Sequence, residues 1–187
     1  MRMCEMKEEE RIIREEPGKA RLSRRNLVLI GMPGVGKSTC GRLAAEKLGR
    51  RFVSLDREIA LAAGRSIPEI FRTEGEEAFR DMESAICRAA AKEKGIVIAA
   101  GGGTVLRAEN TASLKENGIL ILLERPVSSL VPTADRPTAD TREKIERLYR
   151  ERKEIYREAA DASVALTGRP EEDIRRILGA FAAAAAG

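Results

Sequence analysis

The stretch GMPGVGKS, from Gly31 to Ser38, limits the possible folds of this chain more than any other segment. It fits the pattern G-x-x-x-x-G-K-[ST], with an apolar run at residues 27–30 before it and a helical pattern at 39–48 after it. Strand, glycine-rich loop and helix in this order predict a phosphate-binding loop, in which backbone N–H groups surround an anion. Lys37 then brings positive charge to the terminal phosphates, and Ser38 offers a hydroxyl to Mg²⁺. Both flanks disfavour the alternative, a glycine turn that ends in Lys-Ser by chance.

Composition and charge narrow the range of functions. The length of 187 residues predicts one domain, at 26–187, preceded by a charged and flexible extension at 1–25. A net charge of +4 and an aromatic content of 3% argue against a nucleic-acid partner and favour a small anionic ligand. Because the chain has no histidine, His-based general-base catalysis and the usual zinc sites are excluded.

The cysteines indicate a reducing compartment. Cys4, Cys40 and Cys87 are odd in number and lack metal-ligand spacing, so we expect reduced thiols. No apolar stretch is long enough to cross a membrane, and no secretion signal follows the first residues. These features predict a cytoplasmic protein that binds no membrane.

Short apolar runs alternate with longer helical patterns along the chain. This alternation predicts an α/β fold of three layers, with a five-stranded parallel sheet between helices. Ligands of such sheets bind beyond the carboxyl ends of the strands, so functional residues are expected directly after each strand. Strands are predicted at 27–30, 52–55, 96–99, 119–123 and 162–166, and helices at 38–48, 56–63, 67–71, 76–94, 109–116, 141–158 and 170–182.

One segment, at 128–140, is irregular. It contains two prolines, few apolar residues and a single arginine, Arg136. Its composition alone fits a plain surface connection. Its position in a phosphate-binding fold favours a mobile lid that carries Arg136.

Asp56 follows the second predicted strand and is a candidate general base. With side chains alternating along a strand, Ser54 and Asp56 are expected on the same side, and Asp56 is expected to face the phosphate loop. A carboxylate there accepts the proton of a substrate hydroxyl as it attacks the γ-phosphate. The alternative is that Asp56 is the N-cap of the next helix, with Glu58 in the first turn. Without the surrounding motifs, we would favour this N-cap role for Asp56.

Two further groups of residues suit an acceptor pocket. Gly101, Gly102 and Gly103 follow the third strand, where adjacent glycines indicate either close approach of a ligand or a flexible turn. Arg80 shares a helix face with Glu83, and Arg152 shares one with Tyr156. Arginine suits a bidentate grip on a carboxylate, although each arginine alone also fits a solvated surface charge.

Taken together, these blocks resemble the shikimate kinase family. The resemblance covers residues 26–178 and rests on ordered segments: GMPGVGKSTCGRLAAEKLG (31–49), LDREI and AAGRSIPEIFRTEGEEAFRDME (55–83), IAAGGGTVL (98–106), DRP (135–137) and LYRERKEIY (148–156). The middle blocks are far more specific than the phosphate loop, which also fits gluconate kinases and nucleotide kinases. The resemblance implies a P-loop kinase fold and transfer of phosphate from ATP, with Mg²⁺, to the 3-hydroxyl of shikimate in aromatic amino-acid biosynthesis. We also expect a monomer.

The same resemblance implies roles for individual residues. Catalysis falls to Asp56 as base, with Lys37 and Arg136, and Ser38 is the metal ligand. Phe71, Phe79 and Glu83 match positions that line or buttress the acceptor pocket, and the Arg169-Pro170 pair matches a segment near the adenine. The implied shikimate-binding residues are Asp56, Arg80, Gly101, Gly102, Gly103 and Arg152, with the arginines on the carboxylate. The implied ATP-binding residues are Gly34, Val35, Gly36, Lys37, Ser38, Thr39, Arg136 and Arg169.

Three departures from the family pattern concern the metal and the lid. Ser54 replaces an acidic residue associated with the Mg²⁺ shell, and Ser129 replaces a second lid arginine. Thr138-Ala139 follow the lid Arg-Pro in place of leucines. Two alternatives therefore stand beside shikimate phosphorylation: a related kinase for another small hydroxy acid, and a ligand-binding protein that kept the fold but lost turnover.

Overall fold

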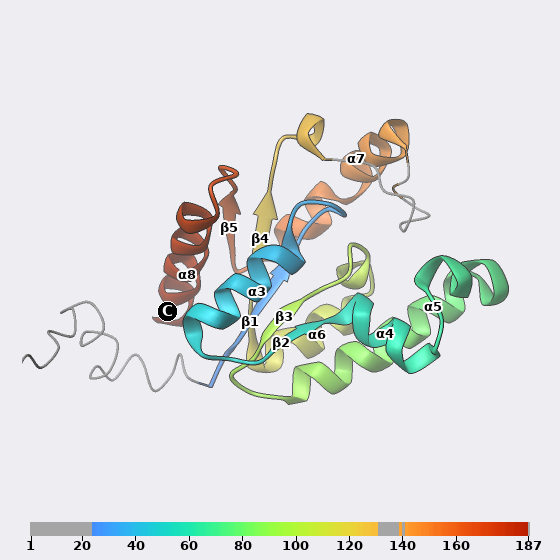
Figure 1. Cartoon of the computed structure of the whole chain (residues 1–187), viewed down its shortest axis with the longest axis horizontal. Coiled ribbons are helices and arrows are strands. Elements are labelled where there is room, and N and C mark those ends of the chain that lie inside the picture. Colours follow the sequence, from blue (N-terminus) through green and yellow to red (C-terminus); the bar gives the residue numbers. More distant parts are fainter. Residues whose placement is uncertain (1–23, 131–138, 140, 187) are drawn as a thin grey trace, which may run out of the picture.

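A computed structural model of the chain describes residues 24–130, 139 and 141–186 (Figure 1). Its centre is a five-stranded sheet in the order β2-β3-β1-β4-β5, and every pair of neighbouring strands is parallel. This confirms the predicted α/β class and its parallel sheet. The strands are β1 (Asn26–Ile30), β2 (Phe52–Ser54), β3 (Val97–Ala99), β4 (Gly118–Glu124) and β5 (Ala162–Ala165).

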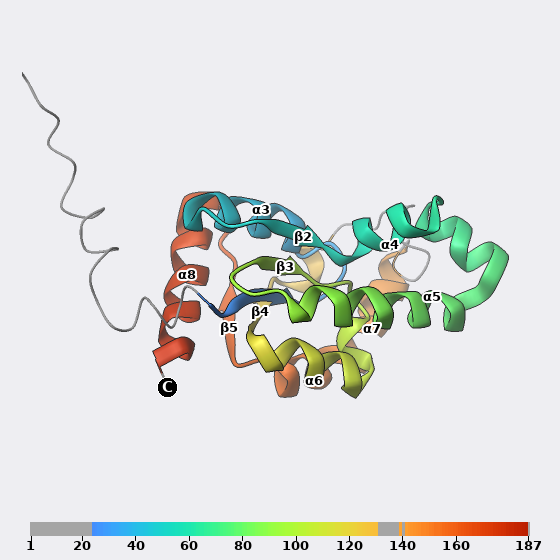
Figure 2. The ribbon, with the colours of Figure 1, turned by 90° about the horizontal axis from the view of Figure 1, so that it is seen from below.

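Helices cover both faces of the sheet. Figure 2 shows α3 and α8 on one face and α6 and α7 on the other, while α4 and the first part of α5 project to one side. Two short 3-10 helices, η1 (Thr104–Leu106) and η2 (Val127–Ser129), follow β3 and β4. The α-helices are α3 (Lys37–Leu48), α4 (Leu55–Ala63), α5 (Ile67–Lys92), α6 (Ala108–Asn117), α7 (Arg142–Ala159) and α8 (Pro170–Ala186).

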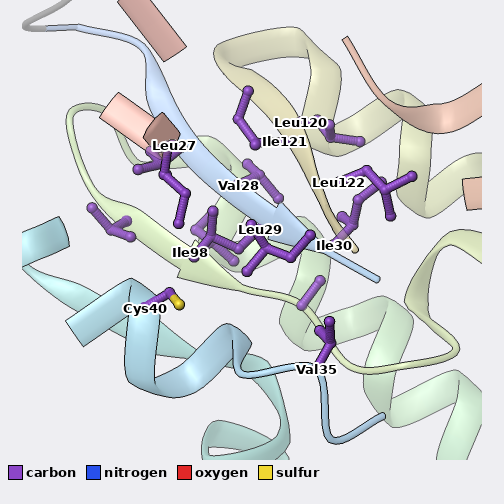
Figure 3. Packing of buried hydrophobic residues seen from close by; sticks show 14 of the residues in the cluster. Leu27, Val28, Leu29, Ile30, Val35, Cys40, Ile98, Leu120, Ile121 and Leu122 are labelled. Atoms are coloured by element: carbon purple, nitrogen blue, oxygen red, sulfur yellow. The ribbon is translucent and has the colours of Figure 1, made fainter. Parts of the chain in front are cut away.

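The central strand is buried on both sides, which explains its uninterrupted apolar sequence. Every residue of β1 is buried, and Val28 is paired with Ile98 of β3 and with Leu120 of β4. A strand with one solvated face would alternate apolar and polar residues, whereas a strand between two helical layers does not. Figure 3 shows the side chains of these strands packed together, with Cys40 of α3 beside them.

Helix α5 joins the two helices predicted at 67–71 and 76–94. The two parts meet at Gly75, which has φ 85° and ψ 175°. Residues other than glycine rarely adopt this conformation. The break at Gly75 agrees with the predicted division into two helices, but the first of them continues through residues 72–74, beyond its predicted end at 71. Around this break a second, smaller apolar cluster of Ile59, Ile70 and Phe79 joins α4 to α5.

Several predictions fall on residues outside the described ranges. Arg136 and most of the predicted lid lie there, and of 128–140 only residues 128–130 and 139 are described. The predicted extension at 1–25 also lies there, apart from Arg24 and Arg25. Among the helices of the described part, none is both long and apolar enough to span a membrane.

Candidate active site

The loop between β1 and α3 has the backbone of an anion cradle. Gly31, Gly34 and Gly36 have φ of 136°, 80° and 113°, which residues with a side chain rarely adopt. Gly31 also leaves no room for a side chain, since a Cβ there would lie 2.6 Å from the carbonyl oxygen of Leu123. The pattern of glycines thus follows from the path of the loop.

The polar groups of this loop gather at the start of α3. Lys37 is the first residue of the helix and is buried, and its Nζ donates to the carbonyls of Gly31 and Met32 at 2.8 and 2.9 Å. Ser38 and Thr39, in the first turn, are exposed and open to a ligand. Val35 is different, because its side chain is buried in the core and only its backbone is left for a phosphate (Figure 3).

Asp56 lies against the second glycine loop, but not for the predicted reason. Helix α4 begins at Leu55, so the alternation of side chains along a strand does not extend to Asp56. The N-cap position belongs to Ser54, whose side chain makes no capping hydrogen bond, so assigning the cap to Asp56 is also wrong. The helix nevertheless brings Oδ1 of Asp56 to within 2.7 Å of the place a Cβ of Gly101 would take.

The glycines after β3 are enclosed by other parts of the protein. A Cβ on Gly101 would lie 2.5 Å from Oε1 of Glu83, and one on Gly102 would lie 2.6 Å from Cγ of Pro33 in the phosphate loop. A Cβ on Gly103 would collide with the guanidinium of Arg80. Close approach of other side chains of the protein therefore accounts for all three glycines, whereas the sequence predicted close approach of a ligand or a flexible turn. The loop contacts both the phosphate loop and α5.

Arg80 is a buried, paired cation and not a solvated surface charge. It is 8% exposed, and its Nη1 donates to Oε2 of Glu83 at 2.7 Å while Nη2 donates to Glu76 at 3.1 Å. Its guanidinium also lies 5.2 Å from the centre of the Phe79 ring. Burial by itself lowers the pKa of Arg80, but the carboxylates of Glu83 and Glu76 outweigh it and raise that pKa.

Arg152 reaches the same glycine loop from α7. It is 8% exposed, and its Nη1 donates to the carbonyl oxygen of Gly102 at 3.2 Å. Tyr156, one turn later, donates its hydroxyl to the same oxygen. Burial raises the pKa of Tyr156 to about 12, so the phenol keeps its proton at neutral pH. The structure thus brings Asp56, Arg80 and Arg152 to one loop, as the sequence suggested.

Two buried polar residues beside this loop escaped the sequence analysis. Oγ1 of Thr104 donates to Oε1 of Glu83 at 2.7 Å, and Nδ2 of Asn110 donates to the carbonyl of Thr104 at 3.0 Å. Both side chains are fully buried. The available signal was the position of Thr104, a polar residue directly after three glycines at the end of a strand.

The loop between β5 and α8 lies beside the phosphate loop. A Cβ on Gly36 would lie 3.8 Å from Cδ1 of Leu166, which begins this loop. Buried Asp173 organises the loop, because it accepts from the N–H of Thr167 at 2.6 Å, its hydroxyl at 2.8 Å and the N–H of Gly168 at 3.1 Å. Asp173 was also missed from the sequence, where it reads as an ordinary acid of a first helical turn.

Arg169 is the last residue of this same loop, directly before α8. Its side chain is 79% exposed and pairs with Glu172 at 3.2 Å.

A separate cleft, of about 460 Å³, contains none of the predicted site residues. It lies between η2 and α7 and is lined by Val127, Ser128, Arg142, Glu146, Tyr149 and Arg150.

No cluster of His, Cys, Asp or Glu suited to a metal ion occurs within the described ranges. Cys40 and Cys87 are both buried and free of disulfides, as reduced thiols would be. Burial, with the charge of Glu83, raises the pKa of Cys87 to about 12. Cys4 lies outside the residues that the structure describes.

Comparison with known proteins assigns the chain to a family. The shikimate kinase family model matches residues 33–182. The chain belongs to the shikimate kinase family. Relatives of this family include the shikimate kinase of Clostridium beijerinckii, 47% identical over 139 residues, which are 72% of this chain and 82% of the relative. The shikimate kinase of Nitrobacter winogradskyi is 46% identical over 82% of this chain and 74% of its own length.

Solved structures of the family share the fold. A shikimate kinase from Acinetobacter baumannii in complex with shikimate superposes with a TM-score of 0.80 and 35% identity, covering 87% of this chain and 95% of that one. The shikimate kinase of Aquifex aeolicus superposes with a TM-score of 0.73 and 31% identity over 83% and 95% of the two chains. A gluconokinase from Sinorhizobium meliloti, at 17% identity and a TM-score of 0.51, shows only that the fold is shared more widely.

Proposed function

We propose that this protein transfers the terminal phosphate of ATP to the 3-hydroxyl of shikimate. The observation that carries the proposal is the convergence of two buried arginines, Arg80 and Arg152, on one glycine loop beside Asp56. Two cations and a carboxylate at one place suit an acceptor that has both a carboxylate and hydroxyl groups. The family membership of the chain supports the same acceptor.

The arginines are proposed to bind the carboxylate of shikimate. A guanidinium forms two parallel hydrogen bonds with a carboxylate, which gives both strength and orientation. Buried arginines are better suited to this than exposed ones, because a charge pair is screened less away from water. Arg80 and Arg152 are held in place by Glu83 and by the Gly102 carbonyl, so little side-chain freedom remains to be lost on binding.

Asp56 is proposed to accept the proton of the attacking hydroxyl. Transfer of a phosphoryl group depends on positioning and on neutralising charge more than on covalent chemistry. A carboxylate in the first turn of α4, against Gly101, fits the role of orienting the acceptor hydroxyl. Arg136 is proposed to add charge from the lid, although it lies outside the described residues.

The phosphate loop fits the triphosphate of ATP. The positive-φ glycines and the start of α3 provide backbone donors, Lys37 provides a cation, and Ser38 and Thr39 are exposed hydroxyls. Arg169 is proposed to lie near the base. Mg²⁺ is proposed to be held by Ser38 together with phosphate oxygens and water, because the described residues offer no acidic cluster for it. When bound, the ion neutralises phosphate charge.

An assay of ADP release tests the proposal. Shikimate should stimulate ADP release in the presence of ATP and Mg²⁺. Gluconate should be a poor acceptor, and so should methyl shikimate, an ester in which the carboxylate charge is absent. Arg152→Met should lower kcat/KM for shikimate by about a hundredfold, as loss of a charged hydrogen-bonding partner does. Arg157→Met, on the exposed side of the same helix, is the matched control.

The outcomes separate the candidate functions. A preference for gluconate or another hydroxy acid would establish a kinase with a different acceptor. Thermal stabilisation by shikimate without ADP release would establish a binding protein without turnover. We also propose that the enzyme is a cytoplasmic monomer with no nucleic-acid partner, which size-exclusion chromatography and fractionation of cells would check.

A further inference from the structure

Each arginine of the proposed carboxylate site donates a hydrogen bond to its own acceptor group, and each acceptor group also accepts a hydrogen bond from a hydroxyl. Arg80 donates to Oε2 of Glu83, and the other oxygen of that carboxylate accepts from Thr104. Arg152 donates to the carbonyl of Gly102, and the same oxygen accepts from Tyr156. The two arrangements meet in one loop, since Thr104 directly follows Gly102 and Gly103.

We propose that Thr104 and Tyr156 are positioning residues that set the direction of the two carboxylate-binding arginines through Glu83 and the Gly102 carbonyl. This inference rests on the proposed function, because it assumes that Arg80 and Arg152 bind the carboxylate of shikimate. It assigns these hydroxyl groups a role in acceptor affinity and none in the transfer step.

The Thr104 side chain fixes the orientation of Glu83. Glu83 is 1% exposed, and one of its oxygens faces Arg80 at 2.7 Å while the other faces Thr104 at 2.7 Å. Without the hydroxyl, the second oxygen would be buried without this donor, and the carboxylate would gain by turning toward Arg80. The guanidinium would then be engaged more fully by Glu83 and less available to a substrate carboxylate.

Thr104 is itself well anchored. Its N–H donates to the carbonyl of Gly101 at 3.3 Å, and its carbonyl accepts from Asn110 at 3.0 Å. The residue is fully buried. Its hydroxyl is therefore a fixed donor, as orienting a neighbouring carboxylate requires.

Tyr156 fixes the carbonyl on which Arg152 rests. A carbonyl oxygen has two lone pairs, and Arg152 and Tyr156 occupy both at Gly102. The phenol is buried in the helical layer, and it joins α7 to the glycine loop across 54 positions of the sequence. Removing its hydroxyl leaves the carbonyl with Arg152 as its remaining donor here, so the arginine is held more tightly to the loop.

Three conservative variants test the inference. Tyr156→Phe and Thr104→Val each remove one hydroxyl with little change of shape, and Thr104→Ser restores the hydroxyl. We expect the first two to raise both KM and Kd for shikimate by about fivefold to tenfold, the effect of one misplaced hydrogen bond. The KM for ATP and kcat should stay within about twofold. Thr104→Ser should behave as the wild type, and so should Tyr149→Phe, the matched control on α7.

Methyl shikimate separates positioning from a merely structural role. If the hydroxyl groups act through the arginines, the loss of kcat/KM should appear with shikimate and should be less than about twofold with the ester, whose charge is absent. Equal losses with both acceptors, or a rise in the KM for ATP of the same size, would overturn the inference.

The inference and the proposed function fail in different ways. A wild-type protein that phosphorylates shikimate, with unchanged shikimate KM in both Tyr156→Phe and Thr104→Val, would refute the positioning role alone. A wild-type protein that neither phosphorylates nor binds shikimate would refute both. Should one variant fold poorly in a thermal melt, the other still decides the matter, because each hydroxyl serves a different arginine.

Discussion

The ammonium nitrogen of Lys37 lies 2.8 Å from the carbonyl oxygen of Gly31, so the loop that is to hold a phosphate is closed by its own cation. A second bond, to the carbonyl of the next residue, Met32, at 2.9 Å, ties the lysine to the start of the loop as well. The lysine therefore has two roles here. It holds the loop in shape before any ligand arrives, and it sets a buried positive charge at the start of α3.

Lys37→Met should abolish most of the activity. The variant has a side chain of similar length. It loses both the positive charge that would act on the transferring phosphate and the hydrogen bonds to the loop carbonyls. We expect kcat to fall by about a hundredfold to a thousandfold, the range seen when one charge-stabilising donor is removed. Coupled measurement of ADP release checks this. Lys47→Met, at the exposed end of the same helix, should leave kcat unchanged; an equal loss there would contradict the assignment.

Gly103→Ala should weaken shikimate binding. The added Cβ would lie 2.6 Å from Cζ of Arg80, so the guanidinium must move, and its bond to Glu83 would be strained or lost. We expect the KM for shikimate to rise at least about tenfold, with the KM for ATP unchanged. Steady-state kinetics with each substrate varied in turn provide the measurement.

Gly179→Ala is the control for the substitution itself. Gly179 lies within α8, is exposed, and has no atom within 4 Å of the position a Cβ would take. Alanine there should stabilise the protein by about 0.5–1 kcal/mol, because glycine is a poor helix former, and should not change either KM. A rise in the shikimate KM of this variant would show that Gly-to-Ala changes act on the site indirectly.

The features predictable from sequence were those that the local backbone determines. The phosphate loop could be located because only glycine adopts the φ values at Gly31, Gly34 and Gly36 without strain. The parallel sheet could be predicted because continuous apolar runs such as β1 need helices on both faces. Each of these conclusions depends on residues close together in the chain.

Other features depend on contacts between distant segments. Thr104 meets Glu83 across 21 positions and Tyr156 meets Gly102 across 54, and no local pattern marks such partners. The start of α4 was misplaced for a related reason. Leu55 is apolar and fully buried, so it fits the end of a strand as well as the start of a helix. The strand was therefore extended one residue too far, and its alternation was applied to Asp56.

Asp173→Asn should destabilise the protein at neutral pH. The carboxylate accepts three hydrogen bonds from Thr167 and Gly168 while it is buried, and an amide would set a donor against one of these donors. We expect the free energy of unfolding to fall by about 2 kcal/mol, as for a buried group left unsatisfied. Urea denaturation checks this, with Glu171→Gln, exposed in the same helical turn, as the control.

The effect of Asp173 should also depend on pH. Burial acts to raise its pKa, but the hydrogen bonds from Thr167 and Gly168 outweigh burial and lower it. A group with a lowered pKa in the folded state contributes its stability above its unfolded pKa, about 3.9, and loses it as the pH falls through the folded value. The difference between wild type and Asp173→Asn should therefore stay constant down to about pH 4 and shrink below it. A difference that grows in acid would contradict this assignment.

Ser54→Asp should lower the requirement for Mg²⁺. Ser54 is the half-buried last residue of β2, at the carboxyl edge of the sheet where the phosphate loop also lies, and related kinases are expected to have an acid there. A carboxylate that orients the water around a metal ion changes metal affinity by about tenfold or more. We therefore expect the Mg²⁺ concentration that gives half-maximal rate to fall by about tenfold in Ser54→Asp.

Ser54→Asn is the matched control, since Ser54 is the N-cap of α4 and Asn caps a helix as well as Asp does. Because Ser, Asp and Asn are N-caps of similar quality, both variants should keep a thermal stability close to that of the wild type, but only the Asp variant should shift the Mg²⁺ titration. Equal shifts in the two variants would rule out the carboxylate charge as the cause, and no shift in either would contradict a place for position 54 in the metal site.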